Sequence, residues 1–157
     1  MKVIVISDSH GNIASLKHVL GFSRKIRADA IVHCGDWNNL KAVEMVLESK
    51  IPLYAVLGNA DIDPMVKRKL KVESKGFGEK VLSFKLGDRK IDVVHNFVMA
   101  SKLFAAEVIF CGHKHFKWEK VIDGVKVIAP GALHSIKPSF AVYDTDTNKV
   151  EFFDLGR

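Results

Sequence analysis

The stretch KVIVISDSHGN, residues 2–12, carries the first strong structural signal of the chain. Its short, continuous run of β-branched residues predicts a buried strand over residues 2–6. Directly after this strand come Asp8 and His10, two side chains that can bind a metal ion. The stretch therefore predicts both the first strand of a sheet and a first pair of candidate functional residues.

The first half of the chain alternates between strand and helix patterns. A near-helical spacing of apolar residues predicts an amphipathic helix over 13–27, and apolar runs predict strands over 29–34 and 53–57. Asn39 can cap a helix between these two strands, and Asp63, followed by proline, can cap another. This alternation predicts a parallel sheet with right-handed crossovers.

The second half consists mainly of strand patterns. Hairpins are predicted over 82–95 and 117–129, a buried strand over 107–111, and two closing strands over 140–155. A short helix is expected near 98–105. No linker, repeat or low-complexity segment interrupts the chain, so we predict a single α/β domain over residues 1–157, with its strands split between two packed sheets.

The composition is that of a globular protein, with 48% hydrophobic and 27% charged residues and a formal net charge of +6. This charge favours phosphorylated or polyanionic partners. The run KRKLK, residues 67–71, is interpreted as a solvated helix face, with a nucleic-acid contact as the alternative. Cys34 and Cys111 form no CxxC motif and predict reduced, buried thiols. Without a signal-peptide or membrane-spanning pattern, we expect a cytoplasmic protein with no membrane contact.

Five predicted strands end in metal-capable side chains, and ligands gather beyond the carboxyl ends of strands in open α/β sheets. These side chains are Asp8, His10, Asp36, Asn59, His95, His113 and His115. Two carboxylates, four imidazoles and one amide, without thiolate, suit manganese, iron, zinc, nickel or cobalt rather than copper(I). Seven donors exceed the needs of one tetrahedral site, so the set predicts two metal ions that share a carboxylate.

The ordered motifs Asp8-x-His10, Gly35-Asp36, Gly58-Asn59, His95 and Gly112-His113-x-His115 resemble the calcineurin-like metallophosphoesterase superfamily. The chain length resembles the small stand-alone YfcE-like phosphodiesterases of that superfamily. The resemblance implies a four-layer α/β/β/α sandwich: two mixed sheets packed face to face, with helices outside.

The resemblance also implies how the seven residues divide. Asp8, His10 and His115 would bind the first metal, while Asn59, His95 and His113 would bind the second, and Asp36 would bridge the two. The implied cofactors are two divalent ions, with manganese the first expectation. The implied reaction is in-line attack on a small phosphodiester by a hydroxide held between the metals.

The sequence departs from the family pattern at two places. Many members carry a histidine directly after the metal-binding asparagine, proposed to protonate the leaving oxygen or steady the phosphate, but here that position is Ala60. Asp61 matches the acidic residue that follows and is expected either to support the centre or to act in catalysis. Asn96 and Phe97 stand where glycine and histidine often follow the hairpin histidine.

Several other residues have two readings. His134, in PGALHSIKP, is a candidate replacement acid or phosphate contact. His33 is expected in the core or beside the centre, and His18 on the surface. Asn12 is expected either to cap the first helix or to touch substrate. Trp37 is expected either to line the cleft or to pack inside.

Three functions fit these observations. The first is a phosphodiesterase with a dinuclear centre. The second is a nuclease, since the double-strand-break repair nuclease shares these motifs and the chain is basic. The third is a non-catalytic scaffold, as a related retromer subunit is, although all seven ligand positions are intact here. Homo-oligomer formation is left open.

Overall fold

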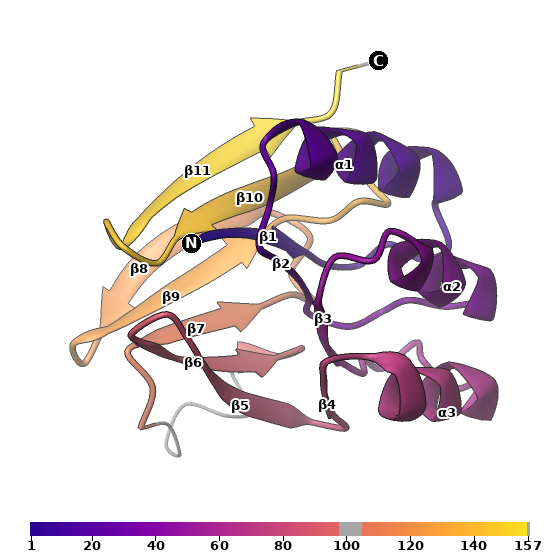
Figure 1. The fold of residues 1–157 in the computed structure, drawn as a ribbon, viewed down its shortest axis with the longest axis horizontal. Helices are drawn as coiled ribbons and strands as arrows, with labels where there is room; N and C mark the ends of the chain where they lie inside the picture. The colour runs from indigo at the N-terminus through magenta and orange to yellow at the C-terminus, as the bar shows by residue number, and fades with distance from the viewer. Residues whose placement is uncertain (98–104, 157) are drawn as a thin grey trace.

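A computed structural model describes residues 1–97 and 105–156 of the protein (Figure 1). Within these residues the helices are α1 (Ile13–Lys25), α2 (Leu40–Glu48) and α3 (Pro64–Glu73). The strands are β1 (Lys2–Ile6), β2 (Ala30–His33), β3 (Leu53–Val56), β4 (Gly76–Gly78), β5 (Val81–Leu86), β6 (Arg89–Val94), β7 (Val108–Cys111), β8 (Lys117–Ile122), β9 (Val125–Pro130), β10 (Ser139–Asp144) and β11 (Lys149–Asp154).

The strands form two mixed sheets. The first has the order β11-β10-β1-β2-β3-β4, and the second has the order β5-β6-β7-β9-β8. In the first sheet β1 to β4 are parallel, while β10 and β11 are antiparallel additions at one side. In the second sheet β6, β7 and β9 are parallel and β5 and β8 flank them antiparallel.

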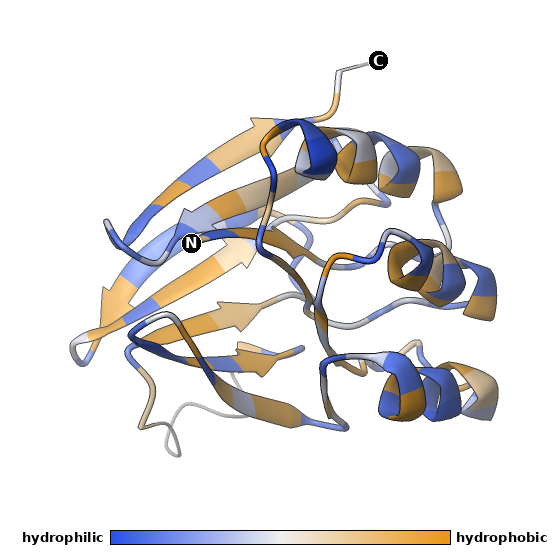
Figure 2. Ribbon diagram, viewed as in Figure 1, coloured by the Kyte–Doolittle hydropathy of each residue, from blue (hydrophilic) through white to orange (hydrophobic). Residues whose placement is uncertain are grey.

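Alternation along β1 shows how the layers pack. Ile4 and Ile6 belong to the apolar cluster shared with the three helices, whereas Val3 and Val5 belong to the cluster between the two sheets. Successive strand residues point to opposite faces, so a continuous apolar run is what a strand buried on both faces requires. In Figure 2 the strands in the middle of the sheets, such as β1, are largely orange, while each helix shows blue as well as orange. The helices are therefore amphipathic and cover one face of the first sheet (Figure 1).

The predicted α/β fold with two packed mixed sheets flanked by helices is confirmed. Helices α2 and α3 begin after the predicted caps, because Asn39 accepts a hydrogen bond from the Ala42 amide and Asp63 accepts one from the Met65 amide. The described helices cover only the first sheet. The helix expected near 98–105 lies outside the described residues except for its last position. Across 1–97 and 105–156, no helix has the length and apolar character needed to span a bilayer.

Candidate metal centre

Six of the parallel strands end at the same edge of the molecule: β1, β2 and β3 from the first sheet and β6, β7 and β9 from the second. Their loops carry all seven candidate ligands and His134. The loops continue the strand pairing by backbone hydrogen bonds: the Asp8 amide donates to Gly35 O (3.0 Å), the His10 amide to Asp36 O (3.0 Å), and the Gly112 amide to His95 O (2.9 Å). The sheets thus hold the ligand-bearing loops in register.

Two glycines of the motifs permit a close approach between loops. A Cβ atom on Gly58 would collide with the Asp36 carboxylate, and one on Gly112 would collide with Ser7 Oγ and crowd Asp8. Any side chain at these positions would therefore push a candidate ligand away. This explains physically why glycine precedes Asn59 and His113 in the sequence.

The structure brings four of the predicted ligands into one cluster. Donor atoms of Asp8, His10, Asp36 and His115 all lie within 4.8 Å of one another. His115 Nε2 lies 3.1 Å from Asp8 Oδ1, and His10 Nε2 lies 3.5 Å from Asp36 Oδ2. Asp8 and Asp36 are buried, whereas the side chain of His115 is 46% exposed. The cluster has carboxylates at its base and imidazole at its solvent side.

The other three predicted ligands gather around one nitrogen atom. His95 Nε2 lies 3.0 Å from Asn59 Oδ1, 3.3 Å from His113 Nδ1 and 3.4 Å from Asp36 Oδ2. Oδ2 of Asp36 therefore lies within 3.5 Å of both His10 Nε2 and His95 Nε2. The structure places all seven predicted residues together, with Asp36 between two groups of three.

The donor chemistry of this site fits a cation. His95 Nδ1 lies 2.8 Å from Cys34 O, an acceptor, so in the neutral ring Nδ1 carries the proton and Nε2 offers a lone pair. That lone pair faces a carboxylate, an amide oxygen and another imidazole. The buried Asp8 Oδ1 accepts no hydrogen bond of good geometry from the described residues, although His115 Nε2 lies 3.1 Å away. A metal ion would stabilise buried lone pairs that converge in this way.

The contact between His95 and Asp36 shifts the pKa of both side chains in the direction that favours their opposite charges. Burial alone would lower the pKa of His95, but hydrogen bonding and charge attraction to Asp36 outweigh it and raise that pKa. Burial opposes the Asp36 carboxylate, yet the His95 contact and the Ala60 amide lower its pKa. The carboxylate is negative and attracts positive charge to this point.

The Asp61 carboxylate binds backbone amides of the loops that form the site. It accepts hydrogen bonds from the amides of Asp36 (2.9 Å), Trp37 (2.7 Å), Asn38 (2.9 Å) and Gly58 (2.8 Å). Burial raises the pKa of Asp61, and these amides act against the shift. One side chain thus ties the loop of Asp36 to the loop of Asn59.

Ala60 contributes through its backbone. Its amide donates to Asp36 Oδ1 over 2.8 Å, while Asp36 Oδ2 faces the histidines. His134 is exposed and lies beside His10, with 5.7 Å between the centroids of the two rings. The His134 amide donates to Asp8 O over 3.0 Å, which anchors this loop to the centre.

His33 and Ser9 form a brace beneath the centre, and sequence reasoning did not find this pair. His33 Nδ1 accepts from the Gly35 amide (3.1 Å), so Nε2 carries the proton and donates to Ser9 Oγ (3.0 Å). The ring stacks on Trp37 at 3.6 Å between centroids. Burial, followed by the charge of His95, lowers the pKa of His33 well below its usual value. A neutral His33 therefore connects the Asp8–His10 loop to the Asp36 loop.

Five of the seven candidate ligands adopt a left-handed backbone conformation. Their φ angles are 50° for Asp8, 40° for His10, 62° for Asp36, 72° for His113 and 59° for His115. Such conformations are uncommon outside glycine and cluster at functional sites. The loops turn sharply so that both His113 and His115 can face the centre although they are two residues apart.

The remaining candidates from the sequence lie at a helix cap, in the core and on the surface. Asn12 caps α1 by accepting from the Ser15 amide, and it also donates to Leu133 O. Trp37 is fully buried and donates from its indole nitrogen to Val56 O, so it packs inside. His18 is exposed on α1.

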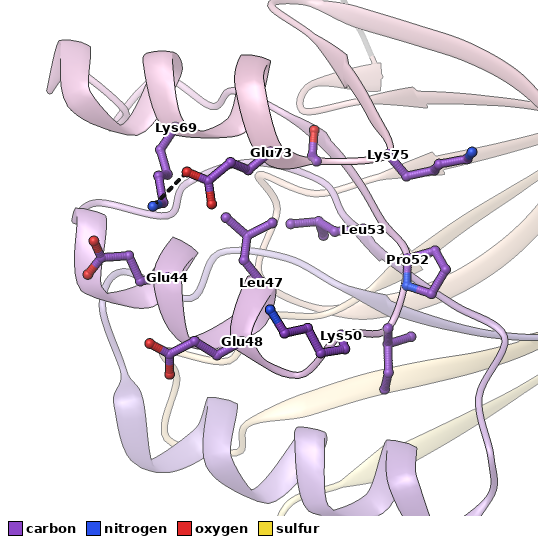
Figure 3. Close-up of a pocket in the computed structure, with 11 residues that line it drawn as sticks. Glu44, Leu47, Glu48, Lys50, Pro52, Leu53, Lys69, Glu73 and Lys75 are labelled. Carbon is purple, nitrogen blue, oxygen red and sulfur yellow. Dashed lines mark ion pairs between the residues drawn. The ribbon is translucent and has the colours of Figure 1, made fainter.

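The hollow between the ends of α2 and α3 is remote from this chemistry (Figure 3). It has a volume of about 610 Å³ and is lined by charged residues that include Glu44, Lys50 and the Lys69–Glu73 ion pair. It adjoins Leu53, where β3 begins, whereas the candidate ligands lie beyond the strand ends. Its size alone does not make it the functional site, because it contains no histidine or cysteine.

Comparison with known proteins agrees with the geometry. The model of the calcineurin-like phosphoesterase superfamily domain matches residues 1–148, and the chain belongs to this superfamily. The chain is 26% identical over 160 residues to the phosphodiesterase MJ0936 of Methanocaldococcus jannaschii, covering 93% of this chain and 94% of that protein.

Two solved structures share the fold. A novel archaeal phosphodiesterase superimposes with a TM-score of 0.85 at 22% identity, over 99% of this chain and all of the other. YfcE, a phosphoesterase from Escherichia coli, superimposes with a TM-score of 0.75 at 19% identity over the same shares. The predicted family resemblance and the metallophosphoesterase class are confirmed.

Proposed function

We propose that the protein is a phosphodiesterase that works with two divalent metal ions. The observation that carries this proposal is the convergence of six metal-capable side chains around Asp36 at one edge of the sheets. One set comprises Asp8, His10 and His115, the other Asn59, His95 and His113, with Asp36 facing both. The relative MJ0936, named a phosphodiesterase, supports the choice of a diester.

When bound, the two ions supply positive charge to the phosphate oxygens and lower the pKa of a water molecule. The chain itself supplies orientation. The Ala60 amide holds one Asp36 oxygen so that the other faces the two histidine groups. Asp61 supports this loop through four backbone amides and has no oxygen left over for substrate in this role.

Position 60 carries alanine, whose side chain cannot protonate the leaving oxygen. We propose that His134, whose exposed ring adjoins His10, contacts the phosphate and does not replace the missing general acid. General-acid help is typically worth about 10²–10⁴-fold. Diesters with acidic leaving groups, such as nitrophenol, should therefore be much better substrates than alkyl diesters. A flat dependence on leaving-group acidity would contradict the absence of an effective acid.

The donor atoms of the site indicate which metals suit it, and the two cysteines indicate the cellular compartment. We propose manganese first among iron, zinc, nickel and cobalt, because oxygen and imidazole donors are mixed without thiolate. Cys34 and Cys111 are both buried and unpaired, which supports a reducing, cytoplasmic setting. The substrate we propose is a small phosphodiester.

A direct experiment measures bound metal and then compares bis(4-nitrophenyl) phosphate, 4-nitrophenyl phosphate and DNA with each divalent ion. We expect about two ions per chain and a clear preference for the diester. Trapping a phosphorylated side chain during turnover would contradict direct attack by water. No turnover with any ion would favour the scaffold function instead.

The nuclease alternative receives little support from helix α3. Lys67 pairs with Glu79 and Lys69 with Glu73, each at 2.7 Å, so half of the cations in the KRKLK run face glutamates. This supports the interpretation of the run as a solvated face. Hydrolysis of DNA in the experiment above would reverse that interpretation.

A further inference from the structure

A groove opens directly beside the proposed metal centre. It has a volume of about 700 Å³ and begins at His115, and the segments that line it are residues 115–117 and 135–137, with Ser139 and Asp154. The site of one phosphoryl group is already provided by the seven donors, so this adjoining space is available for another part of a substrate.

Hydrogen bonds and an ion pair hold the segments around the groove in place. The amides of Leu133 and His134 donate to Ser7 O and Asp8 O, which fixes one lining segment to the strand that carries the first ligands. Ser139 Oγ donates to Pro130 O over 2.9 Å. Lys117, from β8 of the second sheet, pairs with Asp154, from β11 of the first, at 2.5 Å. A groove held in this way exists before a substrate binds, which lowers the entropic cost of binding.

Two of its lining side chains are large, apolar and exposed. The ring of Phe116 belongs to a residue that is 57% exposed, and Ile136 is 83% exposed. Neither contributes to the clusters that form the core of the described residues. Apolar side chains at the rim of a functional groove gain free energy when a ligand covers them.

The groove also offers one cation. The ammonium of Lys117 is neutralised by Asp154, whereas Lys137 forms no ion pair with any residue in 1–97 or 105–156. A free lysine near a site for a phosphodiester attracts a second negative group on the same ligand.

We propose that this groove binds one ester arm of the phosphodiester substrate, and that this arm is large, contains a flat apolar ring and carries a second anionic group. The ring covers Phe116 and Ile136, and the anionic group pairs with Lys137. The inference rests on the proposed phosphodiesterase function and extends it to a class of substrate. A phosphomonoester or a methyl ester would leave these three side chains unused.

Four chromogenic diesters with one leaving group test the proposal. Each is a 4-nitrophenyl phosphate, and the other arm is methyl, phenyl, thymidine 5′-linked, or thymidine 5′-linked with a 3′-phosphate. In every case water adds to phosphorus and releases its protons to solvent, the bond to the nitrophenyl oxygen breaks, nitrophenolate leaves with the electron pair, and the arm remains on the phosphomonoester product. Differences in kcat/KM then report the arm alone.

We expect kcat/KM to rise about tenfold from the methyl arm to the ring-bearing arms, as the covering of one ring by two apolar side chains would give. The 3′-phosphate should add a further several-fold gain. Phe116→Ala and Ile136→Ala should each remove most of the ring gain and leave methyl-ester turnover within about twofold. Lys137→Ala should remove only the gain from the 3′-phosphate.

Ile62→Ala is the matched control, because Ile62 is 89% exposed at the same edge and does not line the groove. It should leave the whole series unchanged. If the methyl ester is hydrolysed but the series is flat, or if Ile62→Ala acts like Ile136→Ala, the groove assignment is wrong and the proposed function stands. If no diester is hydrolysed with any ion, the proposed function itself fails.

Discussion

The two edges of the stacked sheets use the same backbone conformation for different purposes. At the edge where the parallel strands begin, left-handed residues are Arg27, Lys50, Asp123 and Asn148, all in turns between elements. At the edge where these strands end, six non-glycine residues are left-handed, and five of them are candidate metal ligands. Each such residue costs roughly 1–2 kcal/mol.

The difference shows where this protein concentrates its strain. At the first edge a left-handed residue only reverses the chain, and another residue could do so at equal or lower cost. At the second edge the conformation aims the functional side chain itself. The left-handed residues therefore lower the stability of the fold where donors must converge, which is typical of functional sites.

The largest expected effect comes from removing charge at the centre. Asp36→Asn keeps the shape of the side chain but removes the negative charge that faces both histidine groups. We expect kcat on bis(4-nitrophenyl) phosphate to fall at least about 10³-fold, with fewer bound ions by elemental analysis. Asp63→Asn is the control, because it makes the same change of residue type at the cap of α3, where asparagine caps a helix as well as aspartate does. Activity of Asp36→Asn within tenfold of the unchanged protein would contradict a bridging role.

A gain of function is expected from adding a side chain at the same edge. Ala60→His places an imidazole beside the proposed reaction site while keeping the amide that holds Asp36. We expect hydrolysis of alkyl diesters to accelerate at least about tenfold, with little change for nitrophenyl esters. Steady-state rates on a matched alkyl and aryl pair measure this. An equal change for both esters would show that position 60 does not reach the leaving group.

Removing the brace between the two ligand loops should reduce stability. Asp61→Ala leaves four backbone amides without their acceptor. We expect the free energy of unfolding in EDTA to fall by about 2–4 kcal/mol. Asp63→Ala removes only one helix cap and should cost about 1 kcal/mol. Urea denaturation of both variants makes the comparison, and equal losses would show that Asp61 is an ordinary capping residue.

The His33 brace should make stability depend on pH. The folded protein holds the pKa of His33 well below that of the unfolded chain, because burial and the His95 charge disfavour its protonation. The unfolded chain therefore binds a proton below about pH 6.5 that the folded protein does not, and stability falls as pH decreases through this range. One proton accounts for at most about 1.4 kcal/mol per pH unit.

His33→Phe keeps the stack on Trp37 and removes this titration. In EDTA, urea denaturation between pH 7.5 and 5 should show a shallower pH dependence for the variant than for the unchanged protein. Parallel curves would mean that His33 is not the group responsible.

The smallest effect is expected at the opposite edge. Lys50 follows α2 with a φ of 62°, a position that glycine occupies without steric cost. Lys50→Gly should raise the free energy of unfolding by about 0.5–1 kcal/mol and leave metal content and kcat unchanged. Thermal denaturation provides the measurement. A loss of bound metal would show that the two edges are coupled.

The sequence was sufficient to predict most of the fold because its signals are local. Apolar runs marked the buried strands, and Asn39 and Asp63 marked the starts of two helices. Strand β4 (Gly76–Gly78) was not predicted, since a three-residue segment with two glycines has no apolar periodicity. Its pairing with β3 depends on tertiary structure.

Only the candidate ligands of the site could be predicted from the sequence. Each candidate ligand follows a strand, so the topology alone suggested that they meet. The contacts that hold them do not follow from spacing: Asp61 is paired with amides 20 or more residues away, and His33 meets Ser9 across 24 residues. Asp61 therefore stayed ambiguous in the sequence, and its use by the backbone is visible only in three dimensions.

The left-handed conformation at the ligand positions also limits how the centre could be redesigned. Asparagine, aspartate and histidine are the non-glycine residues that adopt this conformation most readily, and they are the residue types found at all seven positions. Glutamate or cysteine would offer equally good donor atoms at Asp8 or His113, yet neither tolerates the turn as well. A change of metal preference by ligand exchange would therefore be limited by the shape of the loops before it is limited by coordination chemistry.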